Sequence, residues 1–116
     1  MNYIIVAGDR DFTNYDYLEQ CLNSLFNTER PRTIISGCAR GVDTLAIQYA
    51  QKHNLPLMKF PADWDTHGKS AGPIRNREMA RNATHLVAFL TPHSKGTRNM
   101  VKQAREFGLT VKIYHI

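Results

Sequence analysis

Four short stretches of this sequence combine glycines with basic, acidic and hydroxyl side chains, the residue types that bind phosphates and sugar hydroxyls. The first contains the candidate ligand-binding residues Gly8, Asp9 and Arg10, followed by Asp11. Gly8 would let a ligand approach the backbone, and Arg10 can pair with a phosphate or stack on a base. The same residues also suit an ordinary turn in which Asp11 helps to cap a helix, so this stretch alone favours neither interpretation.

The second stretch, residues 36–44, reads SGCARGVDT and joins an apolar run to a helical pattern. Such a loop can point consecutive N–H groups at an anion, aided by the start of the helix. Asp43 would hold a ribose hydroxyl or simply favour the helix start, and Cys38, with no helper identifiable in the sequence, fits a small packed residue. The candidate ligand-binding residues are Ser36, Gly37, Ala39, Arg40, Gly41, Asp43 and Thr44.

The third stretch places basic residues around the start of a predicted helix. Its candidate ligand-binding residues are Asp63, Trp64, Lys69, Arg75 and Asn76. Asp63 would take a sugar hydroxyl, whereas Trp64 would stack on a base or serve a core or an interface. Gly68, Lys69 and Ser70 resemble the end of a P-loop, but position 63 is not the required glycine and we expect no helix directly after Ser70, so we exclude an NTPase P-loop.

The fourth stretch follows another apolar run and ends in Lys95, Gly96 and Thr97. These three residues are candidate ligands of a phosphate, with Thr97 as the cap of the helix that follows. The alternative is a capped helix with no ligand.

Other chemistries are missing from the sequence. It has no G-x-G-x-x-G motif, no acidic residue at the end of the second strand and no G-x-S-x-G motif, which argues against a dehydrogenase or an α/β-hydrolase. The five histidines lack metal-ligand spacing. We therefore expect neither a metal nor a cofactor.

Periodicity predicts the elements that position these stretches. The predicted strands are 3–7, 33–35, 57–60, 85–90 and 110–114, and the predicted helices are 15–26, 42–50, 73–82 and 97–107, with a loop over 61–72. Alternating strands and helices predict one three-layer α/β/α domain over residues 1–116, with a parallel sheet of about five strands. Ligands bind such sheets beyond the carboxyl ends of the strands, where all four stretches fall.

Charge and composition narrow the partners. Of the 116 residues, 42% are hydrophobic, and the formal net charge is +5. The basic excess lies in residues 61–116, with nine basic against four acidic side chains, which suggests an anionic partner, polymer or small molecule. No stretch has the length of a signal peptide or a membrane span, and there are only two cysteines, so we expect a cytoplasmic protein with no membrane partner.

Five motifs in this order resemble the SLOG superfamily, which includes the DNA-processing protein DprA and the LOG phosphoribohydrolases, and most of all its small YspA/YpsA-related branch. The motifs are G-x-R-D-F at 8–12, S-G-x-A-R-G-V-D-T at 36–44, F-P-A-D-W at 60–64, G-K-x-A-G-P-I-R-N-R-x-M at 68–79 and K-G-T at 95–97. The resemblance implies a Rossmann-like fold with strand order 3-2-1-4-5. It also implies a nucleotide-type ligand whose phosphates lie at the Ser-Gly and Gly-Thr loops.

The LOG enzymes cleave the base from a nucleoside monophosphate with an arginine and a glutamate. By resemblance, Arg75 stands at the arginine position and is the candidate catalytic residue, but Met100 stands at the glutamate position. A thioether cannot act as an acid or a base. Asp9, Asp43 or Asp63 would have to replace the missing carboxylate.

Three hypotheses follow, in this order. The first is binding of a small nucleotide or nucleotide-derived signal, as a sensor or a sequestering module. The second is a LOG-like nucleotide-processing enzyme. The third is DprA-like binding of single-stranded nucleic acid, ranked last because the sequence lacks the repeated aromatics of a stacking platform. The family likeness also predicts a homo-oligomer.

Overall fold

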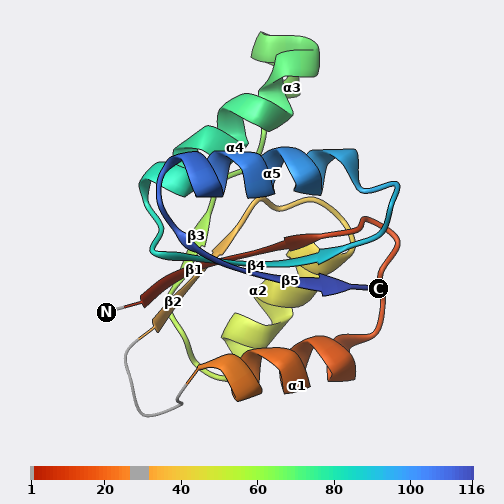
Figure 1. Ribbon diagram of the computed structural model, residues 1–116, viewed down its shortest axis with the longest axis vertical. Helices are drawn as coiled ribbons and strands as arrows, with labels where there is room; N and C mark the ends of the chain where they lie inside the picture. The colour runs from red at the N-terminus through yellow and green to blue at the C-terminus, as the bar shows by residue number, and fades with distance from the viewer. Residues whose placement is uncertain (1, 27–31) are drawn as a thin grey trace.

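The computed structural model describes residues 2–26 and 32–116. Strands and helices alternate along the chain (Figure 1). The strands are β1 (Asn2–Gly8), β2 (Arg32–Ser36), β3 (Leu57–Lys59), β4 (His85–Leu90) and β5 (Thr110–His115). The helices are α1 (Tyr15–Leu25), α2 (Val42–Lys52), α3 (Trp64–His67), the 3-10 helix η1 (Gly68–Ser70), α4 (Ala71–Arg81) and α5 (Lys95–Glu106).

The five strands form one parallel sheet in the order β3-β2-β1-β4-β5. The predicted Rossmann-like architecture and strand order are therefore confirmed. β1 lies at the centre, where Ile5 is paired with both Ile35 of β2 and Leu86 of β4. The strand order reverses on either side of β1, and this is the point at which open α/β sheets form their ligand crevice.

Alternate residues of the central strand face two separate cores. Ile4 and Val6 pack on the side covered by α1 and α2, against buried residues such as Leu18 and Tyr49. On the other side, the residues that pack under α4 and α5 include Ile5, Ala7, Ile35, Met79, Leu86, Met100 and Val101. Figure 1 shows these helix pairs on opposite faces of the sheet. Each side chain that the sheet buries fully contributes roughly 1.5–3 kcal/mol, so the two cores fix the strand ends that carry the candidate site.

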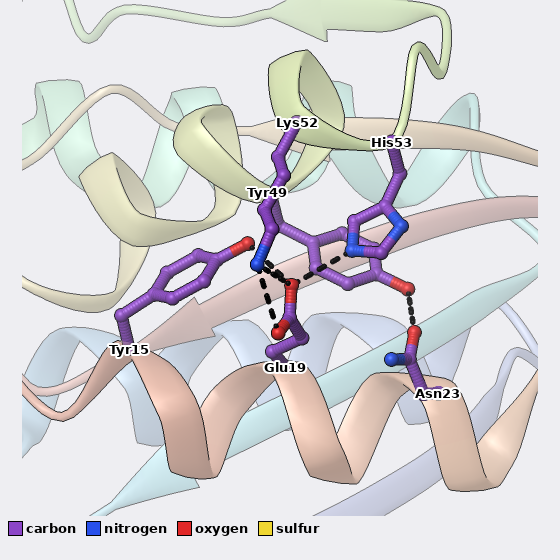
Figure 2. Close-up of polar contacts among 6 residues, drawn as sticks. All are labelled: Tyr15, Glu19, Asn23, Tyr49, Lys52 and His53. Carbon is purple, nitrogen blue, oxygen red and sulfur yellow. Dashed lines mark hydrogen bonds and ion pairs between the residues drawn. The ribbon is translucent and has the colours of Figure 1, made fainter.

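A polar network joins α1 to the end of α2 (Figure 2). The carboxylate of Glu19 accepts hydrogen bonds from Tyr15 Oη at 3.0 Å and from Lys52 Nζ at 3.1 Å. It also lies 2.8 Å from Nε2 of His53. The Lys52 and His53 contacts hold the pKa of Glu19 down, to about 2. This network lies between the two helices and contributes no group to the candidate site.

The structure corrects two predicted element boundaries. The segment 61–72 was predicted to be a loop, but Asp63 caps a helix there by accepting a hydrogen bond from Thr66 N at 3.1 Å. α3 and η1 bury no residue and project from the body beyond α4 (Figure 1). α4 then starts directly after Ser70, so the expected absence of a helix there was wrong. The P-loop remains excluded, because its place is taken by α3 and η1.

The second correction concerns α5. The helix begins at Lys95 with Ser94 as its N-cap, so Thr97 lies inside the first turn and is not the cap that the sequence predicted. At the other end, Gly108 has a φ of +76°, as expected for the residue that ends this helix.

No helix in the described part of the chain combines the length and the apolar character needed to cross a bilayer.

Candidate functional site

Two adjoining hollows open at the carboxyl end of the sheet, beside the strand-order reversal. The first, of about 430 Å³, lies between the loops after β1, β2 and β4 and the start of α5. The second, of about 560 Å³, lies between the loop after β2 and the Pro61–Trp64 segment. Both are lined by Arg10, Ala39, Arg40 and Arg75. The two hollows together are called the cleft below.

Asp9 ties together the loops that form the first hollow. Its backbone N–H donates to the Phe89 carbonyl of β4 at 2.9 Å, and its carbonyl accepts from Val42 N at the start of α2 at 3.2 Å. Its carboxylate accepts from Ser94 Oγ at 3.1 Å and from Asp11 N at 3.0 Å. Asp9 was predicted to bind a ligand, and the structure places it in the lining, where it holds three loops in position.

The start of α5 forms one wall of this hollow. The Ser94 hydroxyl donates to Asp9 and accepts from Thr91 N, and it makes no capping bond to the N–H groups of α5. Lys95, Gly96 and Thr97 line the hollow, and nothing lies within 4 Å of the position that a Gly96 side chain would occupy. A helix N-terminus of this kind carries partial positive charge and exposes N–H donors, so an anion fits there.

Most polar side chains of the loop after β2 form hydrogen bonds within the loop itself. Ser36 is fully buried, and its hydroxyl donates to the Asp43 carbonyl and accepts from Cys38 N. The Thr44 hydroxyl donates to the Ala39 carbonyl at 2.9 Å. The hydroxyls that the sequence offered as phosphate donors therefore shape the loop instead of lining the cleft.

Arg75 separates the two hollows. It extends from α4, where its Nη1 donates to the Gly37 carbonyl and its Nε donates to Asn76 Oδ1 at 3.0 Å. Asn76 in turn donates to Asn99 Oδ1 at 3.0 Å and to the Gly96 carbonyl at 3.3 Å. The guanidinium is thus held directly by the β2 loop and, through Asn76, by α5.

This arrangement explains why residue 37 is a glycine. A Cβ at Gly37 would come within 2.6 Å of Arg75 Nη1 and 2.9 Å of Asp43 Oδ2. The structure gives Gly8 a different role from the predicted one, because a Cβ at this position would lie only 2.3 Å from the Phe89 carbonyl oxygen. Gly8 lines the cleft, but its lack of a side chain serves the packing of β4 against β1.

Asp43 places a buried carboxylate at the floor of the first hollow. Only 6% of the residue is exposed, and its Oδ2 accepts from Ala39 N at 3.2 Å. Burial raises its pKa to about 6, although that hydrogen bond and the charges of Arg75 and Arg10 oppose the rise. The same burial lowers the pKa of Arg75, against the attraction of Asp43. The two opposite charges therefore influence each other in a partly dry setting, where electrostatic interactions are stronger than in water.

The second hollow is less polar. Trp64, Pro61 and Ala62 form one wall, and Gly37 and Cys38 form the other. Trp64 is half exposed, and its ring lies over Gly72 of α4, with Cη2 3.4 Å from where a Cβ would stand. One side of the Trp64 ring is packed and the other is exposed, so the flat ring of a ligand could stack on the exposed side.

The structure brings most of the predicted residues to the cleft. Those in its lining are Gly8, Asp9, Arg10, Gly37, Ala39, Arg40, Asp43, Trp64, Arg75, Asn76, Lys95, Gly96 and Thr97. Those not brought to its lining are Ser36, Gly41, Thr44, Asp63 and Lys69. Gly41 has a φ of +76° and packs on the backbone of Arg10, Asp63 caps α3, and Lys69 lies on the exposed η1.

Sequence reasoning missed several lining residues. These are Ala7, Asp11, Met79, His93, Ser94 and Met100 in the first hollow and Cys38, Pro61 and Ala62 in the second. Ser94 carried a usable signal, since a serine just before a helical pattern is a typical N-cap. Met100 was expected on the apolar stripe of its helix, and it is 1% exposed in the core beneath the cleft.

The cleft lacks the donor set of a metal centre. Within the described residues, no group of three or more His, Cys, Asp or Glu side chains is placed to hold a metal ion. Its chemistry is that of anion and hydroxyl binding: four cationic side chains, an open helix N-terminus and two buried or tethered carboxylates.

The fold matches a solved structure of DNA processing protein A (DprA) from Streptococcus pneumoniae, with a TM-score of 0.79 and 19% sequence identity. The match covers 97% of this chain but only 50% of the DprA chain, and at this identity it is a likeness of fold.

Sequence comparison gives a closer relation. The Gene 61 protein of Mycobacterium phage D29 is 30% identical over 118 residues, covering 96% of this chain and 94% of that protein. The model of the YspA, cpYpsA-related SLOG family matches residues 3–67, which include the loops after β1 and β2 that build the cleft. The chain therefore belongs to the YspA, cpYpsA-related SLOG family.

Proposed function

We propose that the cleft binds a small phosphorylated nucleotide or nucleotide-derived molecule, and that the protein acts as a sensor or a sequestering module. The observation that carries this proposal is Arg75, a half-buried guanidinium held between two hollows and opposite an uncapped helix N-terminus. An arginine in this setting is suited to a phosphate, because a desolvated guanidinium forms strong charge-assisted hydrogen bonds.

The first hollow suits the phosphate and the sugar. Gly96 and Thr97 offer backbone N–H groups, and Lys95 adds a positive charge at the rim. Asp43, buried on the floor, is an acceptor for a sugar hydroxyl. A phosphate at α5 and a hydroxyl at Asp43 would orient a ribose phosphate across the hollow.

The second hollow suits a base. Its wall is made by the half-exposed ring of Trp64 together with Pro61 and Ala62, which give an apolar surface for stacking. Arg10 and Arg40 lie in both hollows and are placed to contact phosphates that link the two. A ligand that fills both hollows, such as an ADP-ribose-type compound or a dinucleotide, would use the whole cleft.

The test is calorimetry of the wild-type chain and two variants against a panel of nucleoside mono- and diphosphates, dinucleotides and ADP-ribose. Arg75→Ala should weaken binding of the best ligand about 10- to 100-fold, since hydrogen bonds to charged groups contribute roughly 1.5–3 kcal/mol. Arg77→Ala is the matched control, because Arg77 is exposed on the same helix outside the cleft lining. Binding that is absent from the whole panel, or equal in the two variants, would refute the proposal.

A second candidate is nucleotide hydrolysis of the LOG type, favoured by Asp43, whose raised pKa of about 6 suits an acid–base group near neutral pH. Release of free base from the bound nucleotide, lost in Asp43→Asn, would establish it. The DprA-like fold leaves single-stranded nucleic acid as a third candidate. That function predicts affinity that rises with oligonucleotide length and falls steeply with salt, whereas a small-ligand cleft shows neither.

A further inference from the structure

A groove unrelated to the cleft runs between α5 and the outer edge of β5. Its floor is apolar, made by Leu90, Val101 and Ile113, and its volume is about 540 Å³. Leu90 and Val101 are nearly buried, so the floor is continuous with the core under α5.

The wall of the groove is basic. Arg98, Lys102 and Arg105 are spaced by four and three residues, which sets them on one face of α5, and all three are exposed. Arg98 donates a hydrogen bond to the Pro92 carbonyl. Among the described residues, none of the three forms an ion pair with a carboxylate. One acid, Glu106, closes the end of the groove.

The open side of the groove is a strand edge. β5 has six residues and pairs with β4 alone in the described sheet, so the N–H and C=O groups along its other edge have no strand partner. Such an edge is a template for an added strand, and Ile113 of the same strand lines the groove. No proline or bulge interrupts β5.

The charges decide which occupant fits. A second copy that paired β5 with β5 about a two-fold axis would bring α5 beside α5, with three cations facing three cations, which is unfavourable. A single-stranded nucleic acid would meet the charges, but no aromatic side chain lines the groove to stack on its bases. An acidic protein segment meets both the cations and the strand edge.

The spacing agrees as well. Arg98 and Lys102 are four helical residues apart, about 6 Å along the axis. Alternate side chains of a strand are about 6.6 Å apart. Glutamates at alternate positions would therefore reach successive cations while their aliphatic stems cover the apolar floor.

We propose that the α5–β5 groove is a docking site for an extended, acidic segment of another protein, which adds to β5 as a sixth strand and pairs its carboxylates with Arg98, Lys102 and Arg105. This site is independent of the cleft, so its test does not depend on the ligand proposed for the cleft.

The probe is a fluorescein-labelled peptide of sequence TEVEVET, followed by fluorescence anisotropy at low and high salt. The wild-type chain should bind it, and the double variant Lys102→Glu/Arg105→Glu should bind about tenfold more weakly. The matched control is Arg77→Glu/Arg81→Glu, which makes the same charge change on the exposed face of α4 and should leave binding unchanged. In amide NMR spectra, the peptide should shift the signals of β5 residues.

Five outcomes would overturn the proposal. A TKVKVKT peptide that binds as well as the acidic one would remove the charge argument. Equal affinities of the two double variants, or unshifted β5 amides, would place the peptide elsewhere. If light scattering shows a dimer that dissociates in Lys102→Glu/Arg105→Glu, the groove is a contact with a second copy. If dT15 binds more tightly than the peptide and this binding is lost in the same variant, the groove is a nucleic-acid site.

Discussion

At the scale of single residues, Asp43 has an unusual position. Its carboxylate is almost completely buried, yet Arg75 and Arg10 favour its ionised form. Burial is the stronger effect, because it raises the pKa to about 6 against those charges. The ionised carboxylate therefore costs folding free energy at neutral pH, and a residue that is kept at such a cost is a candidate for function.

Asp43→Asn should change how stability depends on pH. The folded carboxyl binds its proton below about pH 6 and the unfolded one below about pH 4, so the wild-type chain loses stability as the pH rises through that range. The asparagine variant has no such proton, and its amide oxygen can still accept from Ala39 N. Relative to Asp43→Asn, the wild-type chain should lose on the order of 3 kcal/mol between pH 4 and pH 7.

Urea denaturation of both proteins at several pH values measures this difference. The control is Asp65→Asn, a neutralised carboxylate on the exposed α3. Parallel pH profiles for wild type and Asp43→Asn would show that the carboxyl titrates in the folded protein as it does in the unfolded chain.

At the scale of elements, one carboxylate of α1 makes several polar contacts at the end of α2, beside the apolar packing and the Tyr49–Asn23 hydrogen bond that also join the two helices. Glu19 of α1 contacts Lys52, His53 and Tyr15 at once (Figure 2). The folded pKa of Glu19 is lowered to about 2 from an ordinary value near 4.5, chiefly by the Lys52 hydrogen bond and then by His53. The stability that it contributes is present above about pH 4.5 and is lost as the pH falls toward 2.

Glu19→Gln should therefore lower the thermal midpoint at pH 7, and the gap to wild type should narrow as the pH falls from about 4.5 to about 2. Glu78→Gln is the control, since Glu78 forms only an exposed pair with Arg81 three residues along the same helix. Scanning calorimetry across this pH range measures both. A gap that stays constant with pH would mean that the glutamine disturbs packing and that the ion pairs contribute nothing.

The elements that the sequence predicts well are those with apolar periodicity. The strand at 85–90 agrees residue for residue, because its side chains are buried on both faces. α3 and η1 bury nothing, so no hydrophobic pattern marks them, and they were expected as loop. For the candidate site, the predicted strand ends indicated which loops would form it. The contacts between those loops could not be predicted from the sequence. Arg75 reaches Gly37, 38 residues away in the chain, and no local pattern encodes that distance.

At the scale of the whole molecule, the projecting end formed by α3 and the start of α4 exposes apolar surface. Trp64 is 50% exposed and Ile74 is 40% exposed. The family likeness predicts a homo-oligomer, and these side chains give it material for a contact between copies. Size-exclusion chromatography with light scattering should give a mass of more than one chain.

The double variant Trp64→Ser/Ile74→Ser should shift that mass toward a single chain without unfolding it, since both side chains are already exposed. Phe107→Ser serves as the control, because Phe107 is equally exposed but lies at the far end of α5. A wild-type chain that elutes at the mass of one copy would contradict the prediction.

The bonds of Asp9 have a consequence for the entropy of ligand binding. This one residue, directly after β1, is joined to Phe89 of β4, to Val42 at the start of α2 and to Ser94 before α5. The loops that surround the cleft are thereby ordered when the chain folds, before any ligand arrives. A ligand then loses mainly its own freedom on binding, since little remains to be ordered in the protein. Even a molecule as small as a nucleotide, with few atoms to contribute contacts, can be held tightly by a cleft that is already assembled.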